Sequence, residues 1–118
     1  MSGVAYKLVD RAEWTAAREA GTYAGSAVDR ADGYIHLSSA EQLPETARRH
    51  YAGRTDLMLV AVDLRAVGDD LRWEASRGGA LFPHLHGPLP VAAATDERGL
   101  SVDDHGVMHF DDGAVGWP

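Results

Sequence analysis

The segment 56–64, DLMLVAVDL, constrains the fold more than any other part of the chain, because both of its alternating sets of positions are apolar. This pattern is typical of a strand that is covered on both faces. The uninterrupted apolar run, LMLVAV, has six residues, which is far too few to cross a bilayer. We therefore expect a central strand at 56–64 with further elements packed on each side of it.

A helix is expected directly after a first strand at 5–9. Asp10 is a residue type that favours the N-cap position, and Glu13 follows three residues later, as in a capping box. Trp14 marks the inward face of this helix, and Gly21 suits its C-terminal end. The N-terminal part of the chain is therefore predicted to be a strand followed by a helix.

A second helix is expected from Ser39 onward. Gln42 completes a second capping pattern with Ser39, although Pro44 favours a start one turn later. Gly53 is expected to end this helix. The preceding segment 21–33 holds three glycines and shows no period, so we expect it to be a long loop.

The C-terminal half is expected to contain strands at 71–76 and 91–95, separated by a loop at 77–90 that is rich in glycine and proline. A hairpin is expected at 99–110 with DDHG as its turn, and residues 111–118 are expected to be frayed. Two helices against six or seven strands, without regular alternation, predict an α+β fold.

Composition limits the classes of function. A length of 118 residues fits one domain, and the absence of cysteine excludes a disulfide scaffold, a thiolate zinc site and a cysteine nucleophile. The net charge of −7 argues against broad nucleic-acid binding but allows a small cationic pocket. The basic residues within 48–54 are interpreted as stabilising a helix C-terminus. No signal peptide is recognised, so we expect a cytoplasmic location without membrane association.

The strand expected at 33–38 carries polar residues on one face. Because side chains alternate along a strand, Ile35 and Leu37 point to one side, and Tyr34, His36 and Ser38 point to the other. A phenol, an imidazole and a hydroxyl in a row make a poor core and a good cleft wall. The alternative is a half-exposed strand whose polar face meets water.

A second group of polar residues stands at the end of the strand at 71–76. Glu74, Ser76 and Arg77 lie close in sequence, and an arginine can grip a phosphate or carboxylate with two hydrogen bonds. Gly78 and Gly79 allow the backbone conformations that phosphate-binding loops need. The alternative is a tight turn with a surface ion pair.

Two histidines follow in this second group. His84 and His86 are two residues apart, so in an extended segment they share a face and could bind a metal ion together with His36 or Glu74. Without cysteine or a helical HExxH spacing this pattern is weak, and no metal is expected. A metal-dependent hydrolase centred on His36, His84 and His86 is therefore kept as a third hypothesis.

Several of these blocks resemble the bacterial and plant family called domain of unknown function 952. The likeness is carried by DGYIHLSS at 32–39 and SRGG-x-LFPHL at 76–85, and it extends collinearly from residue 5 to about residue 95. This family is grouped by fold with ADP-ribosyltransferase-like proteins. The resemblance implies a single small domain over 1–118 with a split, mostly antiparallel sheet and a cleft that holds NAD in relatives. The hairpin and tail at 96–118 lie outside the likeness.

The chain also has a more distant likeness to RNA 2′-phosphotransferases, through the segments 35–38, 57–63 and 73–76. Those enzymes place a histidine or arginine in the first strand to hold the ribose of NAD, where this chain has Tyr6 and Lys7. The difference favours, as an alternative, a non-enzymatic ligand- or partner-binding module that has lost the NAD chemistry.

The first hypothesis is a transferase-like enzyme whose cleft binds a nucleotide or another small anionic, phosphorylated ligand, with NAD or a related nucleotide as cofactor. The resemblance and the motifs together suggest that His36 contacts ribose or acts as acid and base, and that Glu74 orients a hydroxyl. Arg77 would hold phosphate. The oligomeric state is left open. The expected ligand contacts are Tyr34, Ser38, Trp73, Ser76, Arg77, Gly78, Gly79, Phe82, His84 and His86, of which Trp73 and Phe82 would be stacking walls.

Overall fold

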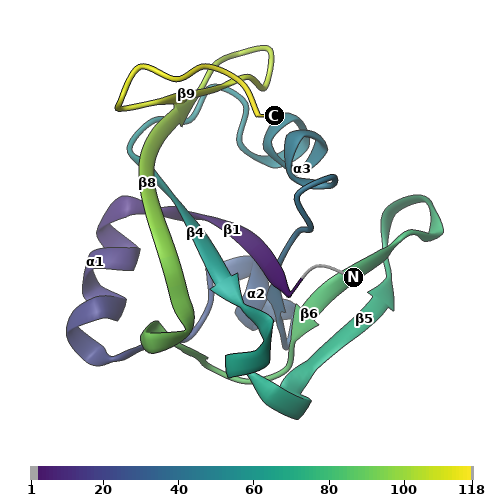
Figure 1. The fold of residues 1–118 in the computed structure, drawn as a ribbon. Helices are drawn as coiled ribbons and strands as arrows, with labels where there is room; N and C mark the ends of the chain where they lie inside the picture. Colours follow the sequence, from purple (N-terminus) through teal and green to yellow (C-terminus); the bar gives the residue numbers. More distant parts are fainter. Residues whose placement is uncertain (1–2, 118) are drawn as a thin grey trace.

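The computed structural model describes residues 3–117, with the exception of the side chain of Arg77, and confirms the α+β class (Figure 1). One antiparallel sheet has the order β1 (Val4–Asp10), β4 (Leu57–Asp63), β8 (Ala94–Val102) and β9 (Met108–Phe110). A second has the order β3 (Ile35–His36), β6 (Leu81–Leu85) and β5 (Leu71–Ala75), and β2 (Thr22–Tyr23) pairs with β7 (Leu89–Pro90). The α-helices are α1 (Arg11–Ala20), α2 (Ala27–Asp32) and α3 (Leu43–His50), and short 3-10 turns occupy Leu64–Ala66, Gly68–Asp70, Arg77–Gly79 and Val91–Ala93.

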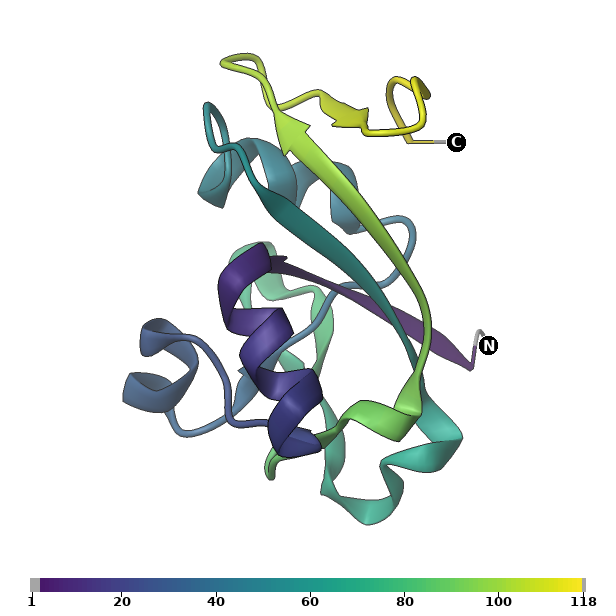
Figure 2. The same ribbon diagram turned by 90° about the vertical axis from the view of Figure 1, so that its left-hand side faces the viewer.

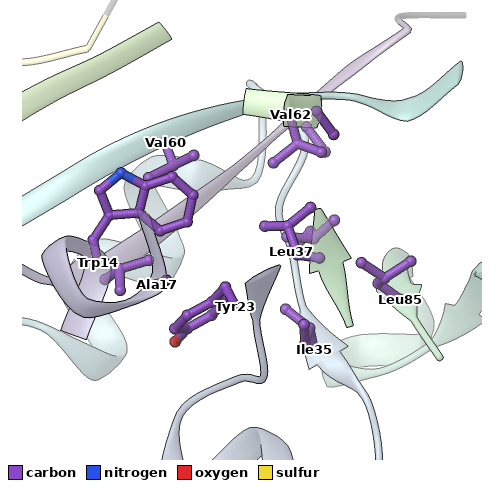
Figure 3. Packing of buried hydrophobic residues seen from close by; sticks show 12 residues of the cluster. Trp14, Ala17, Tyr23, Ile35, Leu37, Val60, Val62 and Leu85 are labelled. Atoms are coloured by element: carbon purple, nitrogen blue, oxygen red, sulfur yellow. The ribbon is translucent and has the colours of Figure 1, made fainter. Parts of the chain in front are cut away.

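Strand β4 is the central strand that the apolar segment predicts, because it pairs with β1 on one side and with β8 on the other. Its alternate residues enter two cores. Val60 and Val62 pack in the cluster around Trp14 of α1 (Figure 3). Leu57 and Leu59 pack in a cluster on the other face, which includes Leu43 and Ala47 of α3, and Figure 2 shows these two helices on different sides of the sheet.

Helix α1 begins and ends where its sequence predicts. The Asp10 side chain accepts hydrogen bonds from the backbone N–H groups of Ala12 and Glu13, which caps the first turn. Gly21 closes the helix with a φ of 89°, a left-handed conformation that suits glycine. Trp14 is buried, as expected for the inward face.

The prediction of a loop over 21–33 is wrong, because this segment contains β2 and α2. Ser26 and Asp29 form a reciprocal capping box at the start of α2. The sequence signal for this helix is weak, because aspartate replaces the usual glutamate or glutamine of that box and because a helix of six residues is too short to show a period. Gly33 ends the helix in a left-handed conformation.

The prediction of a loop over 77–90 is also wrong, because it contains β6 and β7. Proline is rarely found within a paired strand, yet Pro83 lies in β6. Its carbonyl accepts a hydrogen bond from Leu37 N–H, so its backbone polar groups face away from β5. The missing N–H therefore removes no bond from the β5–β6 ladder.

Other boundaries also differ from the sequence prediction, and the strand expected at 33–38 is shortened to Ile35–His36. The strand expected at 91–95 starts only at Ala94, since the preceding residues form a 3-10 turn and alanine has a low strand propensity. Ser39 and Gln42 do exchange capping hydrogen bonds. Nevertheless α3 starts one turn later, where Pro44 favours it, and ends at His50.

The C-terminal tail is packed and not frayed. The hairpin of β8 and β9 is confirmed, and the chain then turns back so that Val115 pairs with His109. Trp117 packs edge-on against Tyr6 with 5.1 Å between ring centroids, and its indole N–H donates to the carbonyl of Ala40. These contacts fix the tail on β1 and on the turn before α3. The structure holds, over the residues it describes, no helix that is long and apolar enough to cross a membrane.

The two larger sheets meet at one point and then separate. Tyr6 of β1 and Ser38 exchange two backbone hydrogen bonds of 2.7 and 2.9 Å. Beyond this bridge, β1 continues along β4, whereas Ile35 and His36 pair with β6. From Lys7 onward this edge of β1 pairs with no further strand in the described part of the chain. Its Leu8 carbonyl accepts a hydrogen bond from the Tyr51 hydroxyl, and a cleft lies beside it.

Candidate functional site

A cleft of about 560 Å³ opens where the two sheets separate, with residues of β1, α2, β3, α3 and β6 in its lining. This volume is typical of sites for small molecules. Four polar or charged side chains are buried in the described part of the chain, and all four line this cleft: Lys7, Asp29, Ser38 and His84. Since buried polar groups are costly unless they have partners, their concentration here marks the candidate site.

Lys7 enters the cleft from β1. Strand alternation places its side chain on the same face as Ala5 and Val9, which point into the core. Its ammonium lies 3.2 Å and 3.4 Å from the two carboxylate oxygens of Asp29 and donates to the carbonyl of His36 at 3.0 Å. Burial lowers the pKa of Lys7, and the attraction of Asp29 opposes this effect only in part.

Asp29 is the centre of the hydrogen-bond network. Besides Lys7, it receives the backbone N–H of Ser26, the backbone N–H of His36 and, at 2.6 Å, the Nδ1 atom of the His36 ring. Burial alone would raise the pKa of Asp29, but the His36 hydrogen bond and the positive charge of Lys7 hold it well below its usual range. Asp29 is therefore a buried, ionised carboxylate.

His36 connects the buried pair with the solvent. Its Nδ1 contacts Asp29, and its Nε2 lies 3.0 Å from an oxygen of Asp32. Lys7 and Asp29 are 5% and 2% exposed, whereas His36 and Asp32 are 33% and 47% exposed. A continuous chain of ionisable groups thus runs from the floor of the cleft to its rim.

A second ionisable cluster adjoins His36. Glu74 contacts His84 Nδ1 at 2.9 Å and His86 Nε2 at 2.7 Å, and these hydrogen bonds lower the pKa of Glu74. Tyr34 stacks on His84 with 4.2 Å between centroids and lies 4.7 Å from the His36 ring. The register His36–His84 across β3 and β6 brings together residues that are 48 positions apart, which is why these separate motifs converge.

A family model described as "Protein of unknown function (DUF952)" matches residues 8–97, which is more than half of the chain. The chain belongs to this family, the domain of unknown function 952.

The crystal structure of protein CC0527 from Caulobacter crescentus is similar, with 52% sequence identity and a TM-score of 0.84 over 89% of this chain and 92% of that one. The solution NMR structure of the same protein gives 51% identity and a TM-score of 0.78 over 89% and 90% of the two chains. No curated protein matches the chain.

The other predicted site residues of this DUF952 protein take different places. Ser76 and Phe82 line the cleft. Ser38 also lines it but is 4% exposed, with its hydroxyl 2.9 Å from that of Thr46. Trp73 pairs with Pro83 and points to the opposite face from Phe82, so these two rings do not form facing walls.

The glycine pair forms the turn of the β5–β6 hairpin. Gly78 and Gly79 have φ values of 65° and 81° and are exposed, so the chain needs glycine there to turn. The side chain of Arg77 is outside the described part of the structure, and the proposed phosphate contact stays a prediction.

Sequence reasoning missed Lys7, Asp29 and Asp32 as site residues. Lys7 is the single lysine of the chain and occupies a core-facing position of a strand, which is a usable signal. The two aspartates could be recognised only together with α2, the helix that was not predicted. Two members of the basic cluster, His50 and Arg54, also line the cleft, whereas Arg48 and Arg49 pair with Glu45.

The arrangement of the histidines does not support the hypothesis of a metal-dependent hydrolase. Among the residues that the structure describes, no group of three or more histidine, aspartate or glutamate side chains is placed to hold a metal ion. His84 and His86 instead bind the same oxygen of Glu74 through hydrogen bonds.

Proposed function

We propose that this DUF952 protein is an enzyme that binds a small nucleotide-like or phosphosugar-like ligand in the cleft and uses His36 as a general acid and base. The observation that carries this proposal is the hydrogen bond between His36 and the buried carboxylate of Asp29. This pair lies at the edge of a cleft that is also lined by Lys7, Ser38 and His84, the other buried polar side chains among the described residues.

The pair of Asp29 and His36 has the parts of an acid–base catalyst. A buried carboxylate fixes the orientation of the imidazole and stabilises its protonated form. Histidine is the side chain that exchanges protons most readily near neutral pH. Asp32, which contacts the other ring nitrogen, is half-exposed, so a ligand hydroxyl can take its place at Nε2 without unfolding the site.

The lining also indicates the class of ligand. Asp10, Glu13 and Asp32 offer carboxylate oxygens that accept hydrogen bonds from hydroxyl groups, and Arg54 offers a cation for an anionic group. Phe82 adds an apolar wall. A ligand with several hydroxyls and one phosphate suits this combination better than a purely anionic one. The separation of the two sheets around the cleft supports the ADP-ribosyltransferase-like architecture, whose relatives hold NAD.

The test is a titration of the isotopically labelled protein with NAD, ADP-ribose, AMP and ribose 5-phosphate at millimolar concentration, followed by NMR. We expect saturable shifts of the amide signals of Lys7, His36 and Ser38 with at least one ligand. His36→Gln should weaken them. His109→Gln is the matched control, because His109 also pairs with an aspartate but lies in β9, away from the cleft. Shifts elsewhere only, or none, would overturn the proposal.

A second candidate, a binding module without catalysis, is favoured by one observation. Both ring nitrogens of His36 are engaged by carboxylates, and the ammonium of Lys7 is held by Asp29, so no described group of this network is directed only at a ligand. Mass spectrometry after incubation with each binding ligand decides between the two. A product that is lost in His36→Gln supports the enzyme, and an unchanged ligand supports the binding module.

A further inference from the structure

We propose that Lys7 is a reactive amine that forms an imine with the carbonyl group of a ligand in the cleft, and that this ligand is a hydroxylated aldehyde or ketone such as a reducing sugar phosphate. This inference rests on the proposed function, since it names the substrate class and a covalent step of the same cleft.

The choice of residue at position 7 is the first observation. The chain contains ten arginines and one lysine, so, histidines aside, arginine supplies every other basic side chain. Arginine stays protonated in proteins, whereas a lysine that loses its proton becomes a nucleophile. The one basic side chain of this chain that can act in this way is buried on the core-facing side of β1 and lines the cleft.

The environment of Lys7 favours release of the proton. Burial disfavours the charged ammonium, which lowers its pKa, as in other lysines that react from desolvated pockets. Three acceptors surround Nζ, of which the Asp29 oxygen at 3.4 Å is the most distant and is already bound to the His36 ring. The neutral amine can therefore keep two hydrogen bonds, to the His36 carbonyl and to the other Asp29 oxygen, and have its lone pair free.

The network provides an acceptor for the proton. Nδ1–H of His36 donates to Asp29, so the free lone pair of the neutral ring is on Nε2, from which the half-exposed Asp32 can turn away. A proton from Nζ can reach Nε2 through water in the cleft, while Nδ1–H stays on Asp29. The imidazolium that results lies between two carboxylates, which stabilise its charge. The proton is thus stored beside the amine and can be returned.

The covalent step balances without an oxidant or a reductant. Nζ attacks the carbonyl carbon, a C–N bond forms, and the π electrons of the C=O bond move to oxygen, which takes a proton from His36. The nitrogen of this carbinolamine gives a proton back to His36. His36 then protonates the hydroxyl group, the C–O bond breaks, and the hydroxyl leaves as water. In total, the Lys7 ammonium and the carbonyl compound give a protonated imine and one molecule of water.

The test uses ribose 5-phosphate and sodium cyanoborohydride, which reduces an imine to a stable amine, with the full-length protein. We expect a single adduct that peptide mapping locates on Lys7, and its loss in Lys7→Arg, which keeps the charge and the ion pair. His36→Gln should slow adduct formation, and His109→Gln should not. An adduct on the N-terminal amine alone, or no adduct, would overturn the inference. Because the wild-type mapping decides this, the result does not depend on the folding of any variant.

Ribitol 5-phosphate, which lacks the carbonyl, separates this inference from the proposed function. If either phosphate shifts the NMR signals of the cleft but ribose 5-phosphate leaves Lys7 unmodified, the imine is refuted and the binding cleft stands. If neither compound binds and no adduct forms, the imine is refuted, and the titration with NAD, ADP-ribose and AMP decides the proposed function. If Lys7 is modified and both compounds bind in the cleft, the imine and the proposed function are both supported.

Discussion

Removing the negative charge of Asp29 should destabilise the protein strongly and in a pH-dependent way. In Asp29→Asn the ammonium of Lys7, 5% exposed, loses its counter-charge while it stays in the core. Breaking a buried ion pair by removal of one partner typically costs about 3–5 kcal/mol. That is a large part of the stability of an ordinary domain, which is about 5–15 kcal/mol.

The protonation of Lys7 limits this cost. The folded variant can avoid burying an unpaired ammonium by releasing the proton, and each pH unit below the ordinary lysine pKa costs about 1.4 kcal/mol. The charge penalty is therefore limited to about 4.6 kcal/mol at pH 7 and about 2 kcal/mol at pH 9. Because the pKa of Lys7 is lowered in the folded state relative to the unfolded one, the penalty is complete at low pH and disappears as pH rises to about 10.4.

Urea denaturation of the wild type and Asp29→Asn at several pH values measures this effect. The double variant Lys7→Met/Asp29→Asn is the matched control, since it removes both charges and should recover most of the lost stability. It also measures the separate loss of the Asp29 contacts to Ser26 and His36. A penalty below about 1 kcal/mol at neutral pH, or one that stays constant as pH rises, would refute the assignment of Lys7 as a buried ammonium.

Three further predictions test other parts of the structure by urea denaturation. Burial raises the pKa of Tyr51 to about 12, so the wild type should lose stability as pH rises from about 10 to about 12, and Tyr51→Phe should show a smaller loss; equal losses would contradict this. Trp117→Ala should cost about 2 kcal/mol because the indole packs on β1 and donates a hydrogen bond, whereas a frayed tail would give almost no change. Gly106→Ala should cost at least about 1 kcal/mol more than Gly113→Ala. Both glycines have positive φ, but only at Gly106 would the new Cβ lie 2.6 Å from the Arg48 backbone. Similar costs for the two variants would contradict the close packing at Gly106.

The parts of the fold that could be predicted are those that local chemistry determines. The apolar alternation of β4 and the Asp10 cap of α1 act within a few residues, and both predictions are confirmed. Helix α2 is too short for a period, and β6 carries Pro83 at a position that is harmless only because of the register with β5. Such elements depend on tertiary partners, which no local pattern contains.

The candidate site, like the fold, could be predicted only in part. Alternation was enough to place Tyr34 and His36 on one face, and the structure brings His84, His86 and Glu74 to the same cluster through the strand register. Which carboxylate would orient His36 could not be predicted, because Asp29 reaches it only by way of α2.

Lys7 shows what a stricter use of the sequence could have found. Alternation already places position 7 on the same side as Ala5 and Val9, so the sequence predicts a charged side chain inside the core. A buried charge requires an opposite charge nearby, and therefore a buried acid had to exist somewhere in the chain. The one lysine of the chain thus requires a second buried ionisable residue, and the pairing with Asp29 across the gap between the sheets is what places the His36 ring at the edge of the cleft.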